Sequence, residues 1–81
     1  MSAKPNTRKL SYKLQRELDS LPAELEAAEA ELEALQQVCA APDFYSQEHA
    51  QVAQALEQLQ QQEALVERLM ERWVELEALQ Q

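Results

Sequence analysis

The chain has 81 residues, no glycine, one cysteine and a formal net charge of −8. Because tight β-hairpin turns often need glycine, and because Leu, Ala, Glu and Gln favour helices, the composition argues against a hairpin-rich β fold. One cysteine excludes an internal disulfide, and no apolar run approaches the roughly 20 residues that cross a bilayer. With no signal-peptide pattern, we expect a cytoplasmic protein that makes no membrane contact.

The charges are divided unevenly along the chain. All 15 acidic residues lie from Glu17 onward, together with only two of the seven bases, Arg68 and Arg72. The bases that precede Glu17 are Lys4, Arg8, Lys9, Lys13 and Arg16. Such a split is typical of a basic arm on an acidic body. A basic segment that only aids solubility would produce the same split.

The first residues divide into a linker and a short helix. Residues 1–10 are polar and contain Pro5, so they are predicted to form a flexible basic linker end. A short helix is predicted over about residues 11–20, with Ser11 as its N-cap because a serine hydroxyl can accept from the free amides of the first turn.

A second helix is predicted over about residues 22–40. Pro22 disfavours a helical conformation for the residue before it, so we expect a break or kink near residues 20–22. Ser20 would then cap the second helix. The apolar residues from this region onward are spaced alternately three and four apart, as in the seam of a left-handed coiled coil. They are Leu18, Leu21, Leu25, Ala28, Leu32, Leu35 and Cys39.

Pro42 ends this seam, and residues 41–46 are predicted to form a loop. A long helix is predicted over about residues 47–80, with Asp43 or Ser46 as its cap. Its seam consists of Val52, Ala55, Leu59, Gln62, Val66, Leu69, Trp73 and Leu76. Two heptad helices joined by a short loop predict an all-α fold for residues 11–81, an antiparallel two-helix coiled-coil hairpin.

Folding this hairpin near residues 43–44 pairs Leu25 with Gln62 and Leu14 with Trp73. The short N-terminal helix would then pack on the open end of the hairpin, where Trp73 is interpreted as a core residue. Gln62 interrupts the apolar seam and could set the register through a hydrogen bond across it.

Three segments carry a more specific pattern: "KLSYKLQREL" at 9–18, "PDFYSQ" at 42–47 and "LMERWVELEAL" at 69–79. Together they resemble the C-terminal domain of the Uup branch of the ABC-F ATPases. The resemblance implies a fragment of a longer ATPase with two ATP-binding cassettes, whose C-terminal extension is associated with DNA binding. Because ABC-F relatives act on ribosomes, it implies ribosomal RNA or the ribosome as the alternative partner.

The candidate nucleic-acid-binding residues are the chain's bases and one tyrosine. Basic side chains bind phosphates by releasing counterions and need not read any base, and a tyrosine can stack on an unpaired base. The alternative is that these bases neutralise nearby acids such as Glu17 and Glu75, and that the tyrosine packs near Trp73. The candidates are Lys4, Arg8, Lys9, Lys13, Arg16, Arg68 and Arg72, with Tyr12 as the weaker one.

We therefore expect a DNA-binding accessory domain, with branched or structured DNA among its partners. The alternative function is a structural spacer, or an arm that docks a ribosome or a protein through Phe44 and Tyr45 at the tip. A phosphate-binding P-loop needs glycines and a Lys-Ser/Thr pair, and the sequence has neither. No enzyme activity, catalytic residue, cofactor or metal site is expected, and the fragment is expected to be a monomer.

Overall fold

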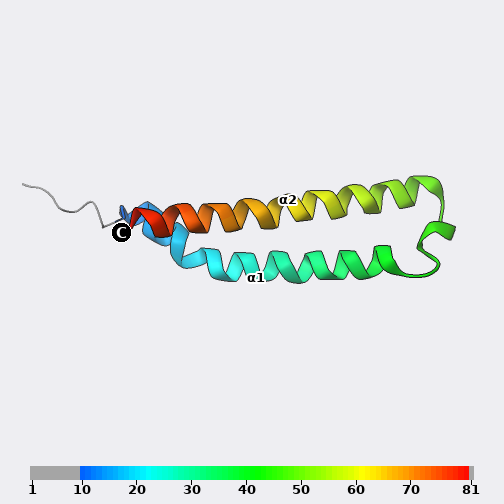
Figure 1. Cartoon of the computed structure of the whole chain (residues 1–81), viewed down its shortest axis with the longest axis horizontal. Coiled ribbons are helices and arrows are strands. Elements are labelled where there is room, and N and C mark those ends of the chain that lie inside the picture. Colours follow the sequence, from blue (N-terminus) through cyan, green and yellow to red (C-terminus); the bar gives the residue numbers. More distant parts are fainter. Residues whose placement is uncertain (1–9, 81) are drawn as a thin grey trace, which may run out of the picture.

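The computed structural model describes residues 10–80 as two long helices joined by a turn (Figure 1). Helix α1 covers Tyr12–Ala40, the 3-10 helix η2 covers Phe44–Ser46, and α2 covers His49–Leu79. The two long helices run antiparallel, so the start of α1 lies beside the end of α2 in a narrow rod (Figure 1). The predicted all-α antiparallel hairpin is confirmed.

Helix α1 begins where predicted but continues through the position where a break was expected. Ser11 is the N-cap, and its Oγ accepts from the Leu14 amide at 3.2 Å. Pro22 lies inside the helix, where it cannot donate to the Leu18 carbonyl. Figure 1 shows α1 bending where its colour turns from blue to cyan, rather than ending there. Residues 11–20 are therefore the first turns of α1 and not a separate short helix.

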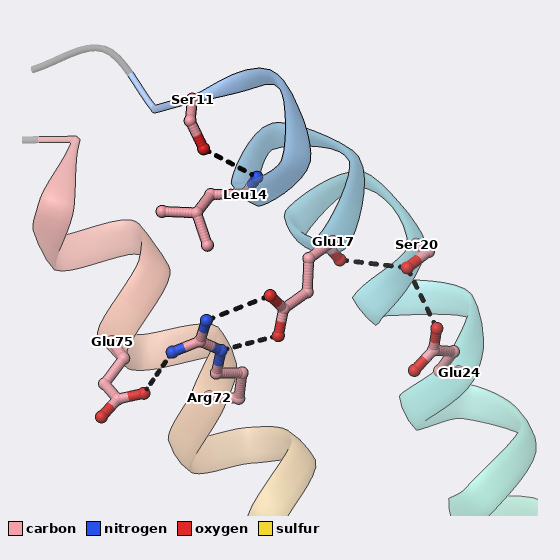
Figure 2. Close-up of polar contacts among 7 residues, drawn as sticks. All are labelled: Ser11, Leu14, Glu17, Ser20, Glu24, Arg72 and Glu75. Atoms are coloured by element: carbon pink, nitrogen blue, oxygen red, sulfur yellow. Dashed lines mark hydrogen bonds and ion pairs between the residues drawn. The ribbon is translucent and has the colours of Figure 1, made fainter.

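Ser20 does not cap a second helix, because it lies within α1. Its Oγ is 3.0 Å from the Glu17 carbonyl oxygen and 3.0 Å from Glu24 Oε2, and it can donate to either (Figure 2). A serine that bonds back to the carbonyl of the preceding turn is associated with bent helices, and a proline is the usual cause of a sharp bend. Both features occur in this segment of α1.

The turn places one aromatic ring inside the molecule and the other outside. Phe44 is 0% exposed, whereas Tyr45 is 71% exposed, and their rings meet edge to face with centroids 4.8 Å apart. Phe44 therefore closes the end of the hairpin, whereas Tyr45 faces solvent. Neither Asp43 nor Ser46 caps α2, because its N-cap is Glu48, which makes no side-chain capping bond.

The register of the two helices differs slightly from the predicted pairing. Gln62 Nε2 donates to the Ala28 carbonyl oxygen at 3.0 Å, so the expected hydrogen bond across the seam forms. Its partner, however, is Ala28 and not a group on Leu25. The physical reason is the turn, which contains a 3-10 helix and delays the start of α2 to His49. A longer turn shifts the register along the helices, while Leu14 and Trp73, which were predicted to pair, pack against the same cluster.

The core consists of two neighbouring apolar clusters along the seam. One cluster is formed by Leu18, Leu21 and Leu76, with Leu10, Leu14, Leu69 and Trp73 packed against it. The other is formed by Leu25, Ala28 and Val66. The first turns of α1 therefore do pack on the open end. Trp73 contributes to both clusters but is only half-buried, and its Nε1 donates to Glu77 Oε2 at 3.2 Å. The fully buried residues at this end are Leu21 and Leu76.

An ion pair fastens the start of α1 to α2 (Figure 2). Arg72 Nε lies 2.6 Å from Glu17 Oε2, Arg72 Nη2 lies 3.0 Å from Glu17 Oε1, and Nη1 lies 2.9 Å from Glu75 Oε1. The two parallel bonds to Glu17 form the bidentate geometry that makes an Arg–carboxylate pair strong and directional. The two paired side chains are 39% and 36% exposed, so solvent screens part of their attraction.

The ion pair also shifts the pKa values of its members. The hydrogen bond from Arg72 is the main reason that the pKa of Glu17 lies below its ordinary 4.5; partial burial opposes this, and the charges of Arg72 and Lys13 add to it. Hydrogen bonds to Glu17 and Glu75 raise the pKa of Arg72 above its already high value. Both groups are therefore ionised at neutral pH.

Replacing Leu76 by alanine tests where the open end is held. Because Leu76 is 0% exposed, Leu76→Ala should lower the free energy of unfolding by about 2–5 kcal/mol in urea titrations followed by circular dichroism. Val74→Ala is the matched control, because Val74 is 69% exposed on the same helix and should cost less than about 0.5 kcal/mol. Equal losses in the two variants would contradict the assigned packing.

Replacing Glu17 by glutamine tests the ion pair through its pH dependence. Because the folded-state pKa of Glu17 is lowered, its contribution to stability is complete above about pH 4.5 and is lost as the pH falls through that lower value. Glu17→Gln should therefore lower the urea midpoint at about pH 7, and its difference from the unmodified chain should shrink towards about pH 3. Glu33→Gln, at an exposed position of α1, should change neither midpoint appreciably. A Glu17→Gln deficit that persists unchanged in acid would mean that the carboxylate charge is not involved.

Candidate nucleic-acid interface

The described candidates at the start of α1 lie together. Lys13 and Arg16 are both exposed and stand three residues apart, which places them on one side of the helix. Tyr12 precedes them and is 79% exposed. Three further predicted residues, Lys4, Arg8 and Lys9, lie outside the described residues. The surface formed by Tyr12, Lys13 and Arg16 is called the α1 basic surface below.

The α1 basic surface is hollowed and contains an organised aromatic–cation contact. The Arg16 guanidinium carbon lies over the Tyr12 ring, 5.8 Å from its centroid, within the range of a cation–π interaction. Tyr12, Lys13 and Arg16 line an open groove of about 600 Å³ together with Glu17 and Ser20. The expectation that Tyr12 packs near Trp73 is not met, because most of the Tyr12 side chain faces solvent.

Arg72 lies near this surface, but its guanidinium is already occupied. Glu17 accepts from its Nε and Nη2, and Glu75 accepts from its Nη1. The sequence left open that the basic candidates neutralise nearby acids. Among the described residues, Arg72 has this role. The pairing compensates the charge of Glu17, the acid that lines the groove of the α1 basic surface.

Arg68 is exposed on α2, in acidic surroundings. It lines one shallow depression that includes Glu31, and another that includes Glu71 and Glu75. Arg68 therefore lies among carboxylates that would compete with a phosphate. Of the four described arginines and lysines, only Lys13 and Arg16 share an exposed surface on a helical turn that has no acid.

The remainder of the described surface is acidic. Every described Asp and Glu except the half-buried Glu17 is exposed. Residues 18–67 contain no lysine or arginine, so the tip around Asp43 and Tyr45 has no basic side chain nearby in the sequence. The positive charge of the described residues therefore lies towards the open end of the rod, where acids such as Glu71 and Glu75 lie as well, and the tip has none.

Sequence reasoning missed one contact of this site and left another open. The neutralisation of Glu17 and Glu75 by a base was the stated alternative, but the identity of that base, Arg72, depends on the register of the helices. The Tyr12–Arg16 contact is local, and the four-residue spacing on one helical face could have suggested it.

Across residues 10–80, no helix combines the length and apolarity that a membrane crossing requires. In the same part of the chain, His, Cys, Asp and Glu side chains form no group of three or more that could hold a metal ion.

Comparisons with known proteins agree with the fold and with the sequence pattern. The chain is 48% identical over 78 residues to the ATP-binding protein Uup of Escherichia coli strain K12, covering 96% of this chain and 12% of that protein. It is 43% identical over 76 residues to the ATP-binding protein Uup-like of Haemophilus influenzae, covering 94% of this chain and 17% of that protein. The chain thus spans only a small part of these relatives.

A solved structure is similar over nearly the whole chain. Its subject is described in the words "The C-terminal domain of the Uup protein is a DNA-binding coiled coil motif", and it matches with a TM-score of 0.81 and 46% identity. The match covers 98% of this chain and 96% of that one. The family model of the ABC transporter C-terminal domain matches residues 9–78. By fold and by sequence, the chain belongs to the ABC transporter C-terminal domain family.

Proposed function

We propose that this domain binds DNA as a C-terminal accessory domain of an ABC-F ATPase, and that Lys13 and Arg16 contact the phosphates. The observation that carries the proposal is the α1 basic surface, where two cations are exposed on a rod that is otherwise acidic. The first turn of α1 has no acid, and the acid that follows it, Glu17, is paired with Arg72. The DNA-binding description of a solved domain with the same fold and 46% identity supports it. Lys4, Arg8 and Lys9, which precede this surface in the sequence, would extend it.

The proposed mechanism is electrostatic. Each cation that neutralises a phosphate releases a condensed counterion, so affinity depends on salt and hardly on sequence. Branched or structured DNA would bring more than one phosphate backbone near the open end of the rod, while the acidic body would repel any strand lying along it. No cofactor or metal ion is needed for this mechanism, and a single copy of the domain is sufficient.

Arg72 has a supporting part in this proposal. By pairing with Glu17 it offsets a negative charge within the groove of the α1 basic surface, and it holds the first turns of α1 on α2. Arg68 contributes less, because its acidic neighbours attract it more readily than a phosphate would. The fragment itself is proposed to have no enzyme activity; hydrolysis of ATP would belong to the cassettes of a longer parent.

A second candidate function is an arm that docks a protein or a ribosome through its tip. The observation that favours it is the exposure of apolar and aromatic side chains at that end, with Tyr45 71% and Val38 52% exposed. Such residues are enriched where proteins meet. Ribosomal RNA is a further alternative partner for the α1 basic surface, because its phosphates present the same chemistry as those of DNA.

Replacing Lys9, Lys13 and Arg16 together by glutamine tests the phosphate grip. Each lost phosphate contact should reduce the slope of log affinity against log salt by about 0.9 on duplex DNA, so the triple variant should flatten it by about two to three units. The affinity should fall alike for unrelated sequences. The measurement is fluorescence anisotropy with duplex DNA, branched DNA and structured RNA at several salt concentrations.

Tyr45→Ser is the matched control at the other end of the rod, and it should leave DNA affinity and the salt slope unchanged. If Tyr45→Ser abolishes binding while the triple glutamine variant binds normally, the proposal is wrong and the docking arm is favoured. Tight binding to structured RNA with none to DNA would instead point to the ribosomal alternative.

A further inference from the structure

We propose that Tyr12 stacks on an unpaired base, and that the α1 basic surface therefore prefers DNA with a single-stranded segment to fully paired duplex. The inference rests on the proposed function, because it assumes that the same surface binds DNA. It adds a ligand class and a specificity-determining residue. The juxtaposition that carries it is an exposed aromatic ring beside two cations in one groove.

The first step is that Tyr12 has no structural task in the described molecule. It is 79% exposed, whereas Leu14 and Leu18 supply the packing of the same helical turns against α2. A single exposed apolar side chain is unremarkable, so exposure alone would not suggest a ligand. The neighbours of Tyr12 are what distinguish it from Tyr45, which is similarly exposed but has no basic residue close to it in the sequence.

The second step is the position of Arg16. Its guanidinium lies 5.8 Å from the centroid of the Tyr12 ring, which helps to hold that long side chain beside the aromatic face. A base that stacks on the accessible part of the ring would then have Arg16 and Lys13 within the same groove, where they can meet the phosphates that flank it. This pairing of stacked aromatics with a positively charged groove is how proteins bind single strands without reading sequence.

The third step explains why the base must be unpaired. In a duplex each base is stacked on its neighbours, and only its edges are open in the grooves. Tyr12 could not reach a base face there, and only the phosphate contacts would remain. In a single strand or an overhang, the base face is available, so the ring and the cations can act together. The contact would tolerate every base, because each has an aromatic face.

Two substitutions of Tyr12 separate stacking from the rest of the surface. Tyr12→Ser removes the ring, and Tyr12→Phe retains it without the hydroxyl. Tyr12 faces solvent, so the helical content measured by circular dichroism should stay unchanged in both variants. Tyr45→Ser is the matched control, because it removes a similarly exposed ring from the other end of the rod.

Affinity is measured for a blunt DNA duplex and for the same duplex carrying a single-stranded overhang. The unmodified chain should prefer the overhang. Tyr12→Ser should lose about tenfold in affinity for the overhang and little for the blunt duplex, whereas Tyr12→Phe and Tyr45→Ser should retain the preference. A fluorescent 2-aminopurine in the overhang should be quenched by the unmodified chain and by Tyr12→Phe, but not by Tyr12→Ser.

The outcomes also separate this inference from the proposed function. If the unmodified chain binds both DNAs equally and Tyr12→Ser changes neither, stacking is refuted while phosphate binding stands. If Tyr12→Ser weakens both DNAs alike, the contribution of the ring does not depend on an unpaired base, and the inference is wrong. If Tyr12→Phe loses the preference as Tyr12→Ser does, the hydroxyl and not the ring matters, and the inference is wrong as well. If neither DNA binds at low salt, the proposed function fails together with the inference.

Discussion

The packing of Leu76, on α2, against Leu18 and Leu21, in the first turns of α1, is the interaction on which the remaining structure depends. Two helices with no other element to cover them have one shared seam, so each buried residue carries a large share of the stability. Leu18 and Leu21 pack against Leu76 at the end of the hairpin where α1 bends. The bend therefore closes the apolar seam, and it also fixes how the basic turns of α1 are presented.

The same bend couples packing to electrostatics. Once Leu18 and Leu21 lie against α2, Glu17 is brought to Arg72, and an acid that would weaken the α1 basic surface is compensated. A surface pair of this kind contributes modestly to folding. Its larger effect is on the local field, because the groove beside Lys13 and Arg16 would otherwise contain an uncompensated carboxylate. Stability and charge arrangement thus have one common origin.

Much of the fold could be predicted from the sequence, because heptad spacing and a proline-containing turn leave few arrangements for two helices. The register was predicted less well, since the spacing does not say that Phe44–Ser46 forms a 3-10 helix that delays α2. Pro22 was read as a break because local conformation disfavours helix before proline. The helix is continuous instead, and residues on both sides of Pro22 pack in the core, namely Leu18 and Leu21 before it and Leu25 after it.

The candidate site was predictable in composition but not in arrangement. Charge counting along the chain finds Lys13 and Arg16, since they stand in the segment without acids. Charge counting cannot show that Arg72 is paired with an acid while Lys13 and Arg16 are exposed. The acid that pairs with Arg72 is 55 residues away, and the register of the helices decides which acid it is. Likewise, the aromatic residues looked similar in sequence, yet Phe44 is enclosed and Tyr12 faces solvent. Tertiary contacts decide whether an arginine is paired and whether an aromatic ring is buried, and the order of residues in the sequence does not show these contacts.

The described helices begin and end at the same end of the rod. Any domain that continues the chain from either helix would be joined beside the α1 basic surface, with the acidic tip far away. If an attached domain rotated about the open end of the rod, points near that end would move little. A nucleic acid held at Lys13 and Arg16 would therefore barely be displaced. The same rotation would sweep Tyr45 through a wide arc. One pair of helices would thus keep the nucleic-acid-binding end nearly stationary while its tip moves over a large distance.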